Sequence, residues 1–138
     1  MISGVPNLPQ PADLTSLVLR VDFTDDERWQ ALADALDETA TCVSDPAFDG
    51  VTLDELVAAD RAAAEDDRLF DLFVADAVAL ADDEWPLLAV DLDVEPGRTF
   101  RVPAEFFSDV SADLAVANLD FAHFADRADE TGTYRGSQ

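Results

Sequence analysis

Three aspartates lie where predicted strands of this sequence end, a position from which side chains can bind a cation. Asp22, Asp76 and Asp91 are each at or near the carboxyl end of such a strand. Open α/β sheets gather ligands at this edge, and carboxylate oxygens suit a hard divalent cation. The alternative is that these acids belong to a surface that is acidic everywhere, and the sequence alone does not show that they converge.

A second candidate for chemistry is the segment 90–94, with the letters VDLDV. It resembles the nucleophile loop of haloacid-dehalogenase-like phosphotransferases, in which the first aspartate attacks phosphorus and both hold Mg²⁺. This motif gives an alternative function, a metal-assisted phosphate-handling enzyme with Asp22, Asp91 and Asp93 as metal ligands. However, aspartate is so frequent here that D-x-D triplets arise by chance, and no lysine is present to neutralise a phosphoryl group. We therefore expect 90–94 to be a solvated hairpin end.

Two arginines interrupt apolar strand segments, and an inward-pointing arginine needs a partner of opposite charge. We expect Arg20 and Arg101 to pair with carboxylates as internal ties. The other interpretation is an anion-binding site, such as a clamp for a carboxylate ligand, or a pocket lined by phenylalanines with Arg101 as the anion contact. Arg20, Arg101, Asp22 and Asp76 are therefore the candidate binding residues.

Composition argues against most catalytic and metal centres. His123 is the single histidine and Cys42 the single cysteine, which excludes a two-histidine site and nearly excludes structural zinc. The chain has no P-loop, no dinucleotide-binding glycine motif, no nucleophile elbow and no lysine for a Schiff base. We expect His123 on the outer face of a helix and Cys42 as a small, half-buried apolar residue. No catalytic residue and no cofactor is predicted.

Charge is the dominant property of the chain. It carries 31 acidic against 8 basic residues, a formal net charge of -23. Such a surface repels phosphate backbones and anionic membranes, so we expect neither nucleic acid nor membrane binding. With 49% hydrophobic residues and nine phenylalanines, the chain should nevertheless fold. The same charge would also arise in a salty cytosol or a GC-rich genome. The lone thiol and the lack of a leader or apolar span favour a cytoplasmic location.

The first half of the chain predicts a strand followed by two helices. Residues 1–11 carry three prolines and should form an extended lead-in. The apolar segment 17–23 predicts an internal strand, and a helix over 25–38 should open with a capping box from Thr24 to Glu27. A loop then runs to Gly50. The last prediction in this half is a helix over 53–66, opened by a second capping box at Thr52 and Glu55.

The second half predicts a hairpin and shorter helices. The segment 69–75 suits both a strand and a helix, and its aromatic and β-branched content favours a strand. A turn at Pro96 and Gly97 predicts an antiparallel pair of strands. The remaining predictions are strands 87–93 and 99–103, helical turns at 104–107 and 112–117, a helix over 120–128 and a polar tail over 131–138.

Scattered phrases of the sequence resemble one known family. They are LVLRVDF and TDDERW (17–29), FVADAVAL (73–80), PLLAVDL (86–92), TFRVP (99–103), NLDFAHFAD (118–126) and YRG (134–136). These phrases resemble a bacterial family of small acidic proteins, common in high-GC bacteria and known only as a domain of unknown function. The resemblance implies a free-standing cytosolic domain, and it supplies no catalytic residues that could be carried over to this sequence. Asn118 and Asp120 fall in the family's Asn-x-Asp-Phe phrase, where a helix cap explains them.

These observations predict one α/β domain over residues 12–130, with a mixed sheet of about four strands covered by helices. The leading functional hypothesis is a non-enzymatic protein whose acidic surface engages a basic protein partner, as inhibitors, immunity proteins and nucleic-acid mimics do. The oligomeric state stays open.

Overall fold

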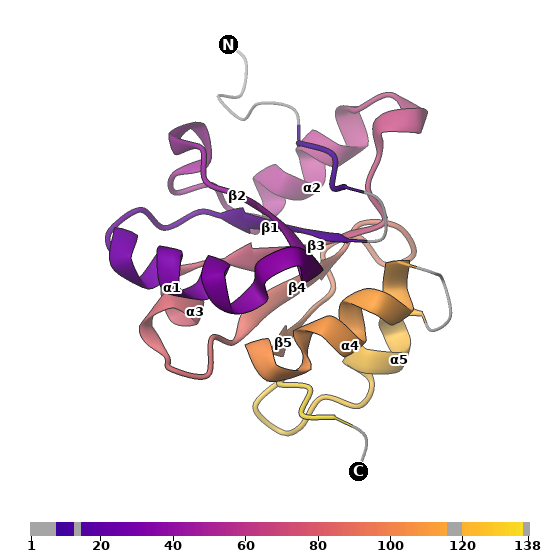
Figure 1. The fold of residues 1–138 in the computed structure, drawn as a ribbon. Coiled ribbons are helices and arrows are strands. Elements are labelled where there is room, and N and C mark those ends of the chain that lie inside the picture. Colours follow the sequence, from indigo (N-terminus) through magenta and orange to yellow (C-terminus); the bar gives the residue numbers. More distant parts are fainter. Residues whose placement is uncertain (1–7, 13–14, 116–119, 137–138) are drawn as a thin grey trace.

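The computed structural model of the protein describes residues 8–12, 15–115 and 120–136. They form one α/β domain around a mixed sheet with the strand order β2-β1-β3-β4-β5 (Figure 1). The strands are β1 Ser16–Arg20, β2 Ala40–Val43, β3 Asp71–Ala75, β4 Leu87–Asp91 and β5 Thr99–Val102. The helices are α1 Asp26–Leu36, α2 Leu53–Ala62, α3 Ala77–Ala81, α4 Ala104–Ala115 and α5 Phe121–Ala125. The predicted fold class is confirmed, with one strand more than expected.

The sheet separates two hydrophobic cores. Alternate residues of β1 show this, because Val18 belongs to the core under α1, α3, α4 and α5, whereas Leu17 and Leu19 belong to the core under α2. Figure 1 accordingly shows α1, α4 and α5 on one face and α2 on the other. Both faces of the central strands are thus covered, which explains why all five residues of β1 are buried.

Strand directions determine which strand ends meet. β1 is parallel to both β2 and β3, with Val18 opposite Phe73. β4 is antiparallel to β3 and to β5, so the predicted hairpin of β4 and β5 is confirmed. Its turn has Gly97 at a φ of 95° and a hydrogen bond from Arg98 N to the Glu95 carbonyl of 2.9 Å. The carboxyl end of β4 therefore lies beside the amino end of β3. The carboxyl end of β3 lies at the other end of that strand pair.

The helix starts confirm one capping prediction and correct the other. At α2, Thr52 and Glu55 form the predicted capping box, and the helix ends at Ala62 instead of residue 66. At α1 the cap is Asp25, whose carboxylate accepts a hydrogen bond from Arg28 N, so the predicted Thr24 and Glu27 box is wrong. The Thr24 hydroxyl donates to Asp22 instead. A carboxylate one residue closer to the helix replaced the hydroxyl as cap.

The predictions for two further segments need correction. The segment predicted as a loop after α1 contains β2, a short edge strand whose residues are all half-buried and therefore show no alternation. The two helical turns predicted near 104–107 and 112–117 form the single helix α4, as far as residue 115, beyond which part of the prediction falls outside the described residues. α4 continues because Phe107, Val110 and Ser111 share one buried face, with the Ser111 hydroxyl bonded to Ser16 at 2.7 Å.

The chain ends also take part in the fold. The lead-in was predicted as extended, and residues 1–7 lie outside the described residues, but Leu8 packs against the core under α2. In the segment predicted as a polar tail, Thr133 pairs with Arg101 at the edge of β5 and the Tyr134 ring is 6% exposed. Tyr134 lies 5.1 Å from the Phe124 ring, so this segment contributes an aromatic side chain to the core. Among the described helices, none has the length and hydropathy to cross a membrane.

Candidate functional site

The three aspartates at predicted strand ends do not converge. Asp22 and Asp76 follow the parallel strands β1 and β3 and lie at one edge of the sheet. Asp91 ends β4, which runs the opposite way, and its register partner is Asp71 at the start of β3. Within the described ranges, no three side chains of His, Cys, Asp or Glu are arranged to hold a metal ion. The expected cation site is therefore not formed. Because β4 runs antiparallel to β3, Asp91 lies at the opposite end of the strands from Asp22 and Asp76.

The motif 90–94 has a structural role at the hairpin. The Asp91 side chain is 2% exposed and accepts hydrogen bonds from Asp93 N and Glu95 N, both at 2.9 Å. The segment is a hairpin end as predicted, but Asp91 is buried and not solvated, because its oxygens satisfy the loop's backbone donors. Asp93 is exposed, and Asp22 accepts from Thr24 at the opposite edge of the sheet. The alternative metal set of Asp22, Asp91 and Asp93 is not brought together.

Both strand arginines make internal ion pairs. Arg101 donates to both carboxylate oxygens of Asp76, at 2.8 and 2.9 Å, and to the Pro86 carbonyl at 3.1 Å. Asp76 also caps α3 by accepting from Ala79 N at 3.0 Å. Arg20 is 3% exposed, donates to the carbonyl of Asp22 and pairs with Asp26 at 2.7 Å. The geometry of both arginines supports the expectation that they pair with carboxylates of the same chain. It gives no support to a clamp for an anionic ligand.

The single cysteine and the single histidine both pack against neighbouring side chains. Burial raises the pKa of the Cys42 thiol to about 11, so the thiolate that a nucleophile needs is suppressed at neutral pH. Cys42 is half-buried, as predicted. His123 is half-buried, and its ring packs edge-on against Phe124 at 5.1 Å. These residues therefore belong to the packing of the domain.

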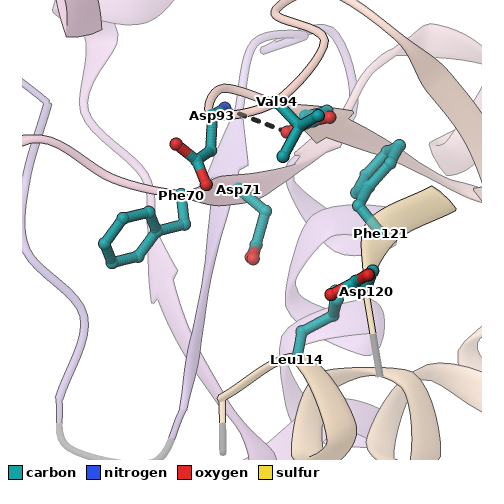
Figure 2. A pocket seen from close by; sticks show the side chains of 8 residues that line it. Phe70, Asp71, Asp93, Val94, Leu114, Asp120 and Phe121 are labelled. Carbon is teal, nitrogen blue, oxygen red and sulfur yellow. Dashed lines mark hydrogen bonds between the residues drawn. The ribbon is translucent and has the colours of Figure 1, made fainter. Parts of the chain in front are cut away.

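One pocket among the described residues combines the earlier candidates Asp91 and Asp93 with positions that sequence reasoning did not single out, such as Phe70 and Asp71. It encloses about 250 Å³ at the start of β3, between the loop after β4, the end of α4 and the start of α5. We call it the Phe70 pocket, and it is lined by Phe70, Asp71, Asp91, Asp93, Val94, Leu114, Asp120 and Phe121. Figure 2 shows the Asp71 side chain directed into the space between Phe70 on one side and Phe121, Asp120 and Leu114 on the other.

Asp71 is the electrostatically unusual group of this pocket. It lies directly opposite Asp91 in the antiparallel pair of β3 and β4. Burial, followed by repulsion from the Asp91 carboxylate, raises the pKa of Asp71 to about 6. Ion pairs between described residues involve neither Asp71 nor any other aspartate of the pocket. The pocket therefore concentrates negative charge that the protein's own arginines do not neutralise.

The pocket also exposes apolar side chains to water. The described chain has three large, exposed apolar residues, and two of them, Phe70 and Val94, line this pocket with exposures of 71% and 78%. The third, Val78, lies on α3 and is not among the lining residues. An aromatic ring beside carboxylates is a combination that binds organic cations, through charge and through the ring face. Chemically, the site suits an ammonium or guanidinium group better than a phosphate.

Sequence reasoning missed the pocket for identifiable reasons. Phe70 precedes β3 and points away from the core that receives Leu69, but an exposed phenylalanine carries no distinguishing sequence pattern. The pairing of Asp71 with Asp91 depends on the direction and register of β4, which a single sequence does not reveal.

Comparison with known protein families places the chain in a family. No curated protein matches the chain. The family described as "Domain of unknown function (DUF6924)" has a model that matches residues 15–137. This range includes every strand and helix that the structure describes and all the residues that line the Phe70 pocket. The chain belongs to this family, which is described as a domain of unknown function.

Proposed function

We propose that this protein is a non-enzymatic binding protein whose acidic surface engages a basic protein partner, in the manner of an inhibitor, an immunity protein or a nucleic-acid mimic. The proposal places it in the cytoplasm, where a lone thiol such as Cys42 stays reduced. It does not require a cofactor or a catalytic residue.

The observation that carries this proposal is the pairing of the chain's few arginines with its own carboxylates. In the described part of the chain, six of the eight arginines form ion pairs with acids of the same chain: Arg20, Arg28, Arg68, Arg98, Arg101 and Arg135. Eight carboxylates take part in these pairs, out of 31 acidic residues in the sequence. Most of the negative charge is therefore available to attract a positively charged surface.

The enzymatic alternative, phosphate handling with a metal at Asp91 and Asp93, has less support. Both oxygens of Asp91 already accept backbone hydrogen bonds, and Asp22 lies at the other edge of the sheet. The competing explanation of the charge, adaptation to a salty cytosol, concerns stability and not binding, so one experiment can separate it from partner recognition.

Immobilised full-length protein in native lysate tests the proposal. In dilute buffer we expect recovery of a basic protein, and loss of that protein in molar salt, where the Debye length falls to about 3 Å. Titration of the purified partner by calorimetry should then give a saturable complex. Recovery of no basic protein from dilute lysate would contradict the proposal. The melting temperature of the free protein, measured in dilute and in molar KCl, reports separately on salt adaptation.

A further inference from the structure

We propose that the Phe70 pocket receives an arginine side chain of the basic partner, with the guanidinium at Asp71 and the aliphatic stem along Phe70. The inference rests on the proposed function and names the chemistry of recognition at one place on the surface. Exposed Phe70 and Val94 form the apolar part of this surface, and the aspartates of the pocket determine the charge of the group that fits beside them.

The protein's own arginines show what such a site recognises. The Arg20 guanidinium lies 4.3 Å from the centre of the Phe23 ring and pairs with Asp26 at 2.7 Å. Arg28 repeats the arrangement, 4.2 Å from the Trp85 ring and 3.0 Å from Asp83. In both cases one guanidinium bridges an aromatic ring and an aspartate, combining ring-face attraction with a charge-assisted hydrogen bond.

The Phe70 pocket presents the same two components from the sequence neighbours Phe70 and Asp71. Its aspartates form no ion pair with a described arginine, and the Phe70 ring is 71% exposed. The loop after β4 adds Asp93 and Val94, while Asp120 and Phe121 face them from the start of α5. A guest cation would therefore meet carboxylates from several elements around an apolar wall.

Arginine fits this site better than lysine. Its planar guanidinium donates two parallel hydrogen bonds to a carboxylate and stacks on a ring, whereas an ammonium acts as a strongly hydrated point charge. At the other end of β3, Arg101 shows this two-point contact with Asp76. Because Asp71 is half-buried beside Asp91, a cation there would also relieve repulsion between two carboxylates.

The net charge of the chain and the size of the Phe70 pocket favour a protein as the source of this arginine. A net charge of -23 disfavours nucleic acids and anionic membranes, and a space of about 250 Å³ suits a single side chain. The exposed Phe70 and Val94 would cover apolar residues that flank the arginine in the partner. The favoured occupant is thus a basic segment with an arginine among apolar neighbours.

The test is a titration of the full-length protein with the capped peptide Gly-Leu-Arg-Leu-Gly, followed by amide shifts in nuclear magnetic resonance spectra at low salt. We expect the shifts to cluster at the residues lining the Phe70 pocket. Asp71→Asn and Phe70→Ser should each weaken binding by about fivefold or more, the loss expected for one charge-assisted or stacking contact. A peptide with citrulline, the neutral isostere of arginine, should bind at least as weakly as the arginine peptide does to Asp71→Asn.

Matched controls separate the pocket from the general charge. Asp34→Asn removes one exposed carboxylate from α1, and Val78→Ser removes the exposed apolar residue outside the pocket, so both should bind the peptide as the wild type does. Equal binding of the citrulline peptide, or shifts elsewhere on the surface, would overturn the inference. If the lysate partner binds Asp71→Asn and Phe70→Ser with wild-type affinity, the inference about the Phe70 pocket is wrong. The proposed function, binding of a basic partner, is not contradicted by that result.

Discussion

The two ends of strand β3 hold aspartates in opposite electrostatic settings. At its end, Asp76 meets the Arg101 guanidinium on both carboxylate oxygens. At its start, Asp71 lies opposite a second carboxylate, Asp91. Both aspartates are half-buried, so burial alone does not distinguish them. The difference is that the fold supplies a cation at one end and a second anion at the other.

This difference separates an aspartate that stabilises the fold from one that costs it stability. Asp76 ties α3 to β5 and caps the helix, which offsets the desolvation of its charge. No arginine in the described part of the chain pairs with Asp71, and burial, followed by repulsion from Asp91, raises its pKa to about 6. Local violations of good electrostatics are expected where a protein binds something else. We therefore expect Asp71, at the start of β3, to serve binding and Asp76, at the end of β3, to serve stability.

Of the two aspartates at the ends of β3, the larger expected effect comes from removing the compensated one, Asp76. Asp76→Ala should lower the free energy of unfolding by about 3 kcal/mol, because it removes a helix cap and leaves Arg101 without its carboxylate. Asp76→Asn can still cap α3 and should lose less, about 1 to 2 kcal/mol. Denaturant unfolding monitored by circular dichroism measures both. A loss below 1 kcal/mol for the alanine variant would show that the Asp76 tie is not a structural one.

Removing Asp71, the uncompensated aspartate, should change the free energy of unfolding in the opposite direction. At neutral pH, Asp71→Asn should raise the free energy of unfolding by about 2 kcal/mol, a value reduced for the partial exposure of the side chain. Because the pKa of Asp71 is raised from 3.8 to about 6, the folded protein holds the proton more tightly than the unfolded chain. The wild type is therefore as stable as the variant below about pH 4, and falls behind it as the pH rises to about 6.

Unfolding free energies of wild type and Asp71→Asn at a series of pH values measure this difference, in which most other titrating groups cancel. A variant that is less stable than the wild type at neutral pH would show that Asp71 has a compensating partner in solution. Asp91→Asn is the companion measurement, because loss of its charge should lower the raised pKa of Asp71 toward its ordinary value.

Those elements of the fold whose signals are local could be predicted from the sequence. The capping box at Thr52 and Glu55 identified the start of α2, and the turn at Pro96 and Gly97 identified the hairpin. Apolar spacing identified the buried face of α1, with Trp29, Leu32 and Leu36 inside. Strand β2 was missed because a short edge strand with half-buried residues has neither alternation nor an apolar run.

The candidate site could not be predicted, because it depends on non-local pairing. The aspartates expected to converge, Asp22 and Asp91, lie at opposite edges because β4 runs antiparallel. Asp71 was not a candidate at all, since its meaning comes from the register that places it opposite Asp91. In a chain so rich in aspartate, residue type carries little information, and the distinction between Asp71 and Asp76 appears only with their neighbours in space.

The smallest expected effect on stability belongs to the aromatic residue beside Asp71. Phe70→Ser should change the free energy of unfolding by no more than about 0.5 kcal/mol, because a ring that is 71% exposed gains little from folding. By contrast Phe73, three residues later and 0% exposed, should cost about 3 to 5 kcal/mol when replaced by alanine. Thermal unfolding of the two variants gives the comparison. A phenylalanine that can be removed without loss of stability, but not without loss of arginine-peptide binding, serves recognition at the start of β3. A large loss of stability in Phe70→Ser would instead assign the ring to the packing of the fold.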